Sequence, residues 1–225
     1  MPLIQYGTFS KYLLEQYYHL ITESQKRAIT WIVVTIELLD TDINYKLLKN
    51  LEQKLKIDDS MLEFLFAMPF FEQTDNGIGM KSIHYKKILL STVPNIKKCD
   101  VAEFLLSYKD CWNLSEIQTE YKACCFNLML GNPMDILEIK GLLTKLSSQN
   151  LPMLKSELLL LSYLYCDKHE PESLNTLGFL VDYLESISEK LLYCNGEIAK
   201  LLTKADEICH KKIKTIKNSD GIDTV

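Results

Sequence analysis

Cysteine and histidine residues in the C-terminal half are of the types that bind zinc. Five residues could supply sulfur and nitrogen ligands, the first two as a Cys-x-x-His pair: Cys166, His169, Cys194, Cys209 and His210. Structural zinc sites usually hold the ion between two closely spaced ligand pairs on turns. Cys194 and Cys209 instead fall on or beside an apolar helical pattern, where side-chain packing explains them. We therefore predict no metal ion and no other cofactor.

Acidic and histidine residues offer two further kinds of chemistry. Asp58, Asp59 and Glu63 resemble one acidic magnesium motif of helical prenyl-transfer enzymes, but Mg²⁺ needs several oxygen ligands and the chain has no second acidic motif. A helix N-cap followed by an acidic first turn explains these positions. The histidines are scattered, without a Ser, Cys or Asp partner at a suggestive spacing. We predict no enzymatic activity; a helical enzyme with an unrecognised site is an alternative.

Residues 75–80, Asp-Asn-Gly-Ile-Gly-Met, resemble the nucleotide-contacting DxGxG box of the GHKL ATPases. In that family the glycines let the chain turn against adenine, and the aspartate recognises its amino group. The asparagine-bearing helix that binds the metal ion in that family has no counterpart upstream in this sequence. Because residues 69–80 also lack helical periodicity, we interpret them as a Gly-rich surface loop and an internal boundary.

Charge and cysteine content restrict the class of partner and the location. The 225 residues carry a net charge of −5, and Arg27 is the one arginine among 25 basic residues. Arginine is the usual residue for bidentate phosphate and base recognition, so we expect no direct nucleic-acid binding. No apolar run approaches the length of a membrane span, and the N-terminus lacks a signal-peptide pattern. An odd number of cysteines, seven, then indicates reduced thiols in an intracellular protein, cytoplasmic or nuclear.

A basic segment stands out within this acidic chain. No acidic residue lies between Asn76 and Cys99. The segment carries a tyrosine and five lysines: Tyr85, Lys81, Lys86, Lys87, Lys97 and Lys98. It is either an ordinary solvated face or a docking surface for an acidic protein, which lysines would steer into place.

The composition and periodicity predict an all-α fold. Leucine and isoleucine far outnumber valine, and there are only 8 glycines and 6 prolines. Residues 81–98 fit a helix or a short hairpin. Caps and apolar spacing predict helices near residues 8–20, 22–39, 41–55, 58–68, 100–108, 115–130, 132–146 and 152–167.

The C-terminal third contains a heptad pattern. Apolar residues alternate at spacings of four and three: Leu180, Leu184, Ile187, Leu191, Cys194, Ile198, Leu201, Ala205 and Ile208. This seam passes through Asn195-Gly196 without a change of phase. It therefore predicts one long helix over 172–216, with two helices broken at Gly196 as the alternative. The fold expected is an irregular helical bundle or α-solenoid-like array with a long C-terminal helix.

These features predict a domain organisation and a function. We expect an N-terminal helical subdomain over 1–75, a C-terminal one over 81–217 and a frayed tail over 218–225. The chain would be a non-enzymatic helical adaptor or scaffold subunit, a homo- or hetero-oligomer whose protein partners are helical. Docking is assigned to the basic segment and to four seam residues: Leu184, Leu191, Ile198 and Leu201. The alternative is an accessory subunit that regulates nucleic-acid transactions through a complex.

Overall fold

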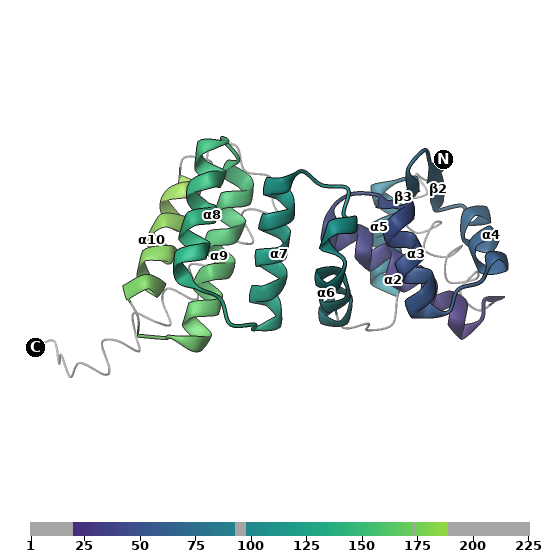
Figure 1. The fold of residues 1–225 in the computed structure, drawn as a ribbon, viewed down its shortest axis with the longest axis horizontal. Helices are drawn as coiled ribbons and strands as arrows, with labels where there is room; N and C mark the ends of the chain where they lie inside the picture. Colours follow the sequence, from purple (N-terminus) through teal and green to yellow (C-terminus); the bar gives the residue numbers. More distant parts are fainter. Residues whose placement is uncertain (1–19, 93–97, 173, 189–225) are drawn as a thin grey trace, which may run out of the picture.

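The computed structural model describes residues 20–92, 98–172 and 174–188, and it confirms a fold dominated by helices (Figure 1). A single small sheet accompanies the helices in these residues. The elements are α2 (Glu23–Leu39), β1 (Ile43–Asn44), α3 (Tyr45–Leu55), α4 (Asp59–Ala67), β2 (Phe71–Thr74), β3 (Gly77–Met80), α5 (Ile83–Thr92), α6 (Lys98–Ser107), a 3-10 helix (Lys109–Cys111), α7 (Glu116–Leu130), α8 (Ile136–Ser148), α9 (Pro152–His169) and α10 (Leu174–Ser188).

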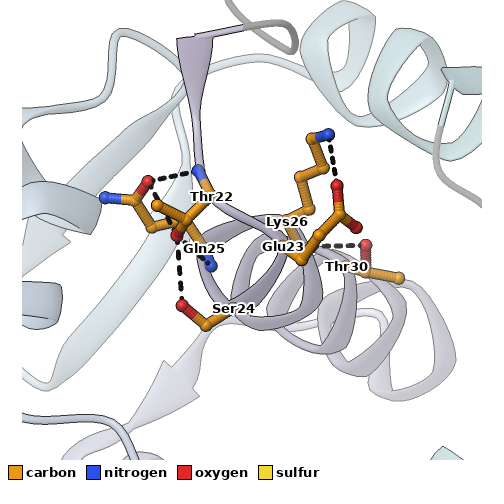
Figure 2. Close-up of polar contacts among 6 residues, drawn as sticks. All are labelled: Thr22, Glu23, Ser24, Gln25, Lys26 and Thr30. Carbon is orange, nitrogen blue, oxygen red and sulfur yellow. Dashed lines mark hydrogen bonds and ion pairs between the residues drawn. The ribbon is translucent and has the colours of Figure 1, made fainter.

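The N-terminal half surrounds the buried helix α2. Its N-cap, Thr22, forms a capping box with Gln25: the Gln25 amide donates to the Thr22 hydroxyl, and the Thr22 amide donates to the Gln25 side chain (Figure 2). The helix that follows is buried on nearly every side, in contact with α5, α6 and the sheet. The predicted start of this helix is thus confirmed, and α2 is the centre of the first hydrophobic core.

The small sheet has β3 as its central strand. Helices α3 and α4 are joined by the three residues 56–58, and the β2–β3 hairpin follows them. The strands pair antiparallel in the order β1-β3-β2. Along the chain, the order of these elements is a helix, a strand, two helices and a hairpin.

The sequence prediction was wrong for the start of the third helix. Thr41 was expected to cap it, but Ile43 and Asn44 form β1 and the helix starts at Tyr45. Asn44 is the N-cap: its side chain accepts from the Leu47 amide at 2.9 Å and donates to the Cys111 carbonyl at 2.7 Å. The second bond joins residues far apart in the sequence, so local spacing could not reveal it.

The loop expected at residues 69–80 is a hairpin, and its glycines are buried. Gly77 pairs with Asn44 of β1 and with Thr74 of β2. A Cβ on Gly77 would overlap the Ile43 carbonyl and lie 2.8 Å from the Asn44 Cα. The glycine therefore allows two strands to approach closely, a role unrelated to nucleotide binding. The resemblance to the ATPase box is a coincidence of sequence.

The C-terminal half is an array of helices. Ser115 forms a capping box at the start of α7, and Gly131, in the left-handed region at φ 70°, ends it; Pro152 opens α9, all as predicted. The helix predicted from Asn132-Pro133 begins at Ile136 instead, because Asp135 is its N-cap and accepts from the Leu137 amide at 2.8 Å.

Two apolar clusters divide the described chain at α7, which lies between them in Figure 1. The first cluster extends from Ala28 to Trp112 and also takes Phe126 from α7. The second contains Tyr121 and Leu128 of α7 and the buried residues of α8, α9 and α10. The hairpin stands at residues 69–80, where the sequence predicted an internal boundary, and it contributes Phe71 and Ile78 to the first cluster. Helix α7 thus belongs to both cores.

The described part of the chain contains no helix long and apolar enough to cross a membrane. The predicted first helix, 8–20, falls almost wholly outside the described residues, as does the part of the predicted 172–216 helix beyond Ser188.

Candidate functional site

Of the residues considered for zinc binding, the structure describes Cys166 and His169, whereas Cys194, Cys209 and His210 lie outside the described residues. Cys166 is buried in the second cluster, and His169 is exposed with its ring centroid 4.4 Å from that of Tyr165. No group of three potential ligands occurs among the described residues. Asp58 is the N-cap of α4 and accepts hydrogen bonds from the Ser60 hydroxyl and the Met61 amide, which lower its pKa. The capping interpretation of this acidic stretch is confirmed.

A partly buried polar cluster joins α7 to α9, with Tyr121 buried and Glu157 exposed. The Tyr121 hydroxyl donates a hydrogen bond to Glu157, and Cys125 lies beside this pair. Burial is the main cause of raised pKa values in all three side chains. It raises the pKa of Tyr121, it raises the pKa of Cys124 to about 11, and it raises the pKa of Cys125 to about 12. Both cysteines therefore stay protonated at neutral pH, and a thiol is a poor nucleophile. These residues hold α7 against α9 and offer no activated group.

Alkylation should distinguish the cysteines. Cys99 is exposed, whereas Cys124 and Cys125 are buried thiols. Iodoacetamide at neutral pH is expected to modify Cys99 readily and the buried pair only after unfolding, as measured by peptide mapping with mass spectrometry. Because the Cys125 pKa is 9.0 when unperturbed and about 12 when folded, its contribution to stability is full below pH 9 and is lost as the pH rises towards 12. Rapid native labelling of Cys124 or Cys125 would contradict this assignment.

The basic segment is only in part a free surface. Lys81, Lys87 and Lys98 are exposed, and Lys97 lies outside the described residues. Lys86, with a side chain 16% exposed, is paired with Glu37 of α2 at 2.9 Å. The ring of half-buried Tyr85 packs against the first cluster, near Phe70. Two of the residues predicted to bind a partner therefore hold α5 in place.

The inner face of α10 is part of the second core. Helix α10 packs closely on α9. Its buried residues are Phe179, Leu180, Tyr183 and Ile187, together with Thr176. Leu180 and Ile187, two of the predicted seam residues, are therefore packed inside the protein. The seam residues from Leu191 onwards lie outside the described residues.

The outer face of α10 carries a second apolar stripe. Its four residues follow one another at spacings of three, four and three, which aligns them along one side of a helix. Their exposed fractions are large for aliphatic side chains: Leu174 87%, Leu177 43%, Val181 51% and Leu184 39%. Leu184 was a predicted binding residue; the other three were missed, although their spacing was visible in the sequence. We name these four residues the outer stripe.

Polar groups border the outer stripe on one side. Asp182 and Glu185 are exposed, and each follows a stripe residue directly in the sequence. Beyond them a groove of about 440 Å³ separates α10 from α8, bridged by a hydrogen bond of 2.9 Å from the Lys140 ammonium to Asn175. Helix α10 is the last described helix and lies at one end of the array (Figure 1). The outer stripe is therefore the most continuous exposed apolar surface of the described residues.

Helix α4 and the hairpin are acidic. In helix-turn-helix DNA-binding proteins the second helix enters the major groove, and lysines or arginines contact phosphates. The stretch from Ile57 to Met80, which contains α4 and the hairpin, has no basic residue. Its acidic residues are Asp58, Asp59, Glu63, Glu72 and Asp75. Their charge has the same sign as that of nucleic-acid phosphates.

No protein-family model, no curated protein and no solved structure matches the chain. The geometry of the described residues is therefore the guide to function.

Proposed function

We propose that this protein is a non-enzymatic helical adaptor, a subunit that holds a protein partner by helix-to-helix contact on the outer stripe of α10. The observation that supports this is a row of four exposed aliphatic residues on the last described helix. A row of exposed aliphatic side chains along one side of a helix is typical of a surface that is covered in an assembly.

The stripe has the dimensions of a helix-docking site. Leu174 and Leu184 are ten positions apart, which is roughly 15 Å along the helix axis and matches about three turns of a partner helix. Burying a fully exposed aliphatic side chain contributes about 1.5–3 kcal/mol, and the stripe residues, which are 39–87% exposed, contribute according to the area that they still expose. A few such anchors dominate the energy of an interface.

Substitutions that introduce a charge into the outer stripe test the adaptor function. We expect a tagged full-length chain, purified from its native cells, to retain a defined set of proteins at stoichiometric levels. The double variant Leu177→Asp/Val181→Asp should lose that set, because a carboxylate buried against an apolar partner surface has no compensating charge. The matched control is Met153→Asp on α9, an equally exposed apolar position off the stripe.

The measurement is quantitative mass spectrometry of the retained proteins, with circular dichroism to show that each variant is folded. Retention of the same proteins by the folded double variant would contradict the proposed docking site. A wild-type chain that purifies alone would contradict the adaptor function itself.

A second candidate is an accessory subunit that acts on nucleic-acid transactions through a complex, and the helix-turn-helix order of elements favours it. Because α4 and the hairpin lack basic residues, we propose that any such role uses protein contacts. The isolated chain should then bind duplex DNA weakly or not at all near physiological salt. Binding with a steep salt dependence would contradict this, since it indicates direct phosphate contacts.

A further inference from the structure

We propose that a groove between α7 and α8 binds an extended, positively charged segment of another protein. This α7–α8 groove is lined by residues of the two helices and of the stretch from Lys109 that leads into α7. It is a different surface from the outer stripe of α10, and its occupant is additional to the partner of the proposed function. Four features support the proposal: the size of the groove, a glycine in its wall, an unpaired indole N–H and an excess of carboxylates.

The α7–α8 groove has the size of a ligand site. Its volume is about 880 Å³, against about 440 Å³ for the groove between α8 and α10. Ligand sites commonly measure roughly 300–1,000 Å³. The α7 residues in the lining extend from Glu116 to Asn127, eleven positions or roughly 16 Å along the helix axis. An extended chain crosses this length with about five residues.

Gly141 leaves open space in the wall of the groove. It lies inside α8 and is exposed, and a Cβ at this position would meet no atom within 4 Å. Glycine within a helix is less stable than alanine, and the packing of the described residues does not require it here. A glycine in the wall does allow the backbone of an occupant to approach α8 closely.

The hydrogen-bonding groups in the lining favour an extended chain over a helix. The side chain of Trp112 is only 7% exposed, and its buried indole N–H has no hydrogen-bond partner among the described residues. The oxygen of the Asn127 side chain accepts from the Asn132 side chain at 2.8 Å, which leaves the Asn127 NH₂ group to donate. An extended chain has free carbonyls that accept from such donors, whereas a helix uses its carbonyls internally.

Carboxylates outnumber lysines in the lining of the groove. The ionisable side chains there are Lys109, Asp110, Glu116, Glu120, Glu138 and Lys145. Lys145 is paired with Glu120 at 2.8 Å and lies near Glu116. Glu116 and Glu138 are exposed, and neither forms an ion pair among the described residues. Two lysines therefore stand against four carboxylates, an excess of two negative charges.

The neighbouring lysines of α7 and α8 do not offset this excess. The Lys122 ammonium lies over the ring of Tyr121, 5.8 Å from its centroid, and the Lys140 ammonium donates to Asn175 of α10. Neither lysine lines the groove. A cationic segment is therefore attracted to the α7–α8 groove, whereas nucleotides and acidic or phosphorylated segments are repelled.

A peptide library tests this proposal on the full-length chain. Phage-displayed random peptides of about ten residues, long enough to span the groove, carry a fixed central proline that prevents binding as a continuous helix. Peptides selected on the immobilised wild-type protein should be enriched in lysine and arginine over aspartate and glutamate. One selected peptide, synthesised with a fluorescein label, is the probe for fluorescence anisotropy. Selection of no peptide, or of peptides without an excess of basic residues, would overturn the proposal.

A side chain added at Gly141 locates the peptide. Gly141→Leu should weaken its binding by about tenfold or more, because the new side chain enters the groove. The variant should stay folded, since the space beside Gly141 is open. The matched control is Gly178→Leu, at a glycine of α10 whose Cβ would likewise meet no atom within 4 Å. If folded Gly141→Leu binds the peptide as tightly as the wild type, the peptide lies elsewhere and the proposal is wrong.

Charge reversal tests the chemistry of the occupant. Glu116→Lys/Glu138→Lys should weaken peptide binding by about tenfold or more. The control Glu63→Lys/Glu172→Lys makes the same change in net charge at two exposed positions outside the groove, and it should weaken binding by less than about threefold. Circular dichroism shows that each variant is folded. Equal losses in the two variants would show a dependence on net charge alone and overturn the proposal.

The outer-stripe variant separates the two surfaces. Leu177→Asp/Val181→Asp should leave peptide binding unchanged, because neither residue lines the α7–α8 groove. Failure of the proposed adaptor function is therefore seen in the proteins retained from cells, and failure of the groove proposal in the peptide measurements. Loss of peptide binding in this variant, while it remains folded, would place the peptide on the outer stripe and contradict the groove proposal.

Two measurements without peptide identify other occupants of the groove. A dimer in analytical ultracentrifugation that Gly141→Leu dissociates would assign the groove to a second copy of the chain. A melting temperature several degrees lower in Gly141→Leu would mean that residues outside the described part of the chain fill it. Either result would overturn the proposal. A monomer whose melting temperature is unchanged or raised by Gly141→Leu, with the peptide preference above, supports it.

Discussion

Gly77→Ala is expected to unfold the N-terminal half of the protein while the C-terminal helices remain folded. The added Cβ would occupy space taken by the Ile43 carbonyl and would lie 2.8 Å from the Asn44 Cα. Backbone atoms of a paired strand cannot move aside as a flexible side chain can. Strands β1 and β3 must therefore separate, which removes Ile43 and Ile78 from the first cluster. We expect a loss of about 3–5 kcal/mol in the free energy of unfolding.

Hydrogen exchange measured by mass spectrometry shows where this loss falls. Amides of α2, α3 and the hairpin should exchange much faster in Gly77→Ala, whereas amides of α8 and α9 should keep their protection, since the two clusters share only α7. Uniform loss of protection along the chain would contradict the division into two cores.

Gly141→Ala is the matched control for the change of residue type. Gly141 lies in α8, and a Cβ there would meet no atom within 4 Å. Alanine has the higher helix propensity, so this variant should be more stable by about 0.5–1 kcal/mol. The same substitution thus has opposite expected effects at two positions, and a similar effect at both would show that the strand contact is not the cause.

Leu158→Ala is expected to destabilise the second cluster strongly. Leu158 is completely buried on α9, the helix that packs on α7, α8 and α10. Its truncation leaves a cavity surrounded by three helices that cannot all close on it, which costs about 2–5 kcal/mol. Urea unfolding followed by circular dichroism measures the change.

Leu164→Ala provides the comparison on the same helix. Leu164 is 40% exposed, so its truncation removes little buried area and should cost less than about 1 kcal/mol. If both truncations cost the same, Leu158 would not be the interior anchor that its burial indicates.

The sequence predicted most of the helices because their signals are local. The caps at Thr22, Asp58 and Ser115 and the end at Gly131 all follow from residues within a few positions of one another. The sheet was missed because its determinants are distant in sequence. The side chain of Asn44 donates a hydrogen bond to the carbonyl of Cys111. Gly77 of β3 must be a glycine because β1, a strand more than thirty residues earlier in the sequence, packs against it.

The exposed apolar stripe of α10 was predicted only in part, for a different reason. Helix α10 is apolar on two sides, and periodicity identifies both stripes without showing which one meets α9. The structure places Leu180 and Ile187 inside and Leu184 outside, with three neighbours that the heptad pattern did not include. Likewise, the sequence of the basic segment does not indicate that Lys86 forms an ion pair with Glu37 of α2.

The sharing of α7 by the two clusters has a consequence for synthesis of the chain. Within the described part of the chain, the buried members of the first cluster lie between residues 28 and 126, and those of the second lie between 121 and 187. Each cluster is thus drawn from one continuous stretch of chain, and the first is complete before α8 has been translated. The N-terminal half is therefore able to fold while synthesis continues, with α7 as the template on which α8 and α9 then assemble.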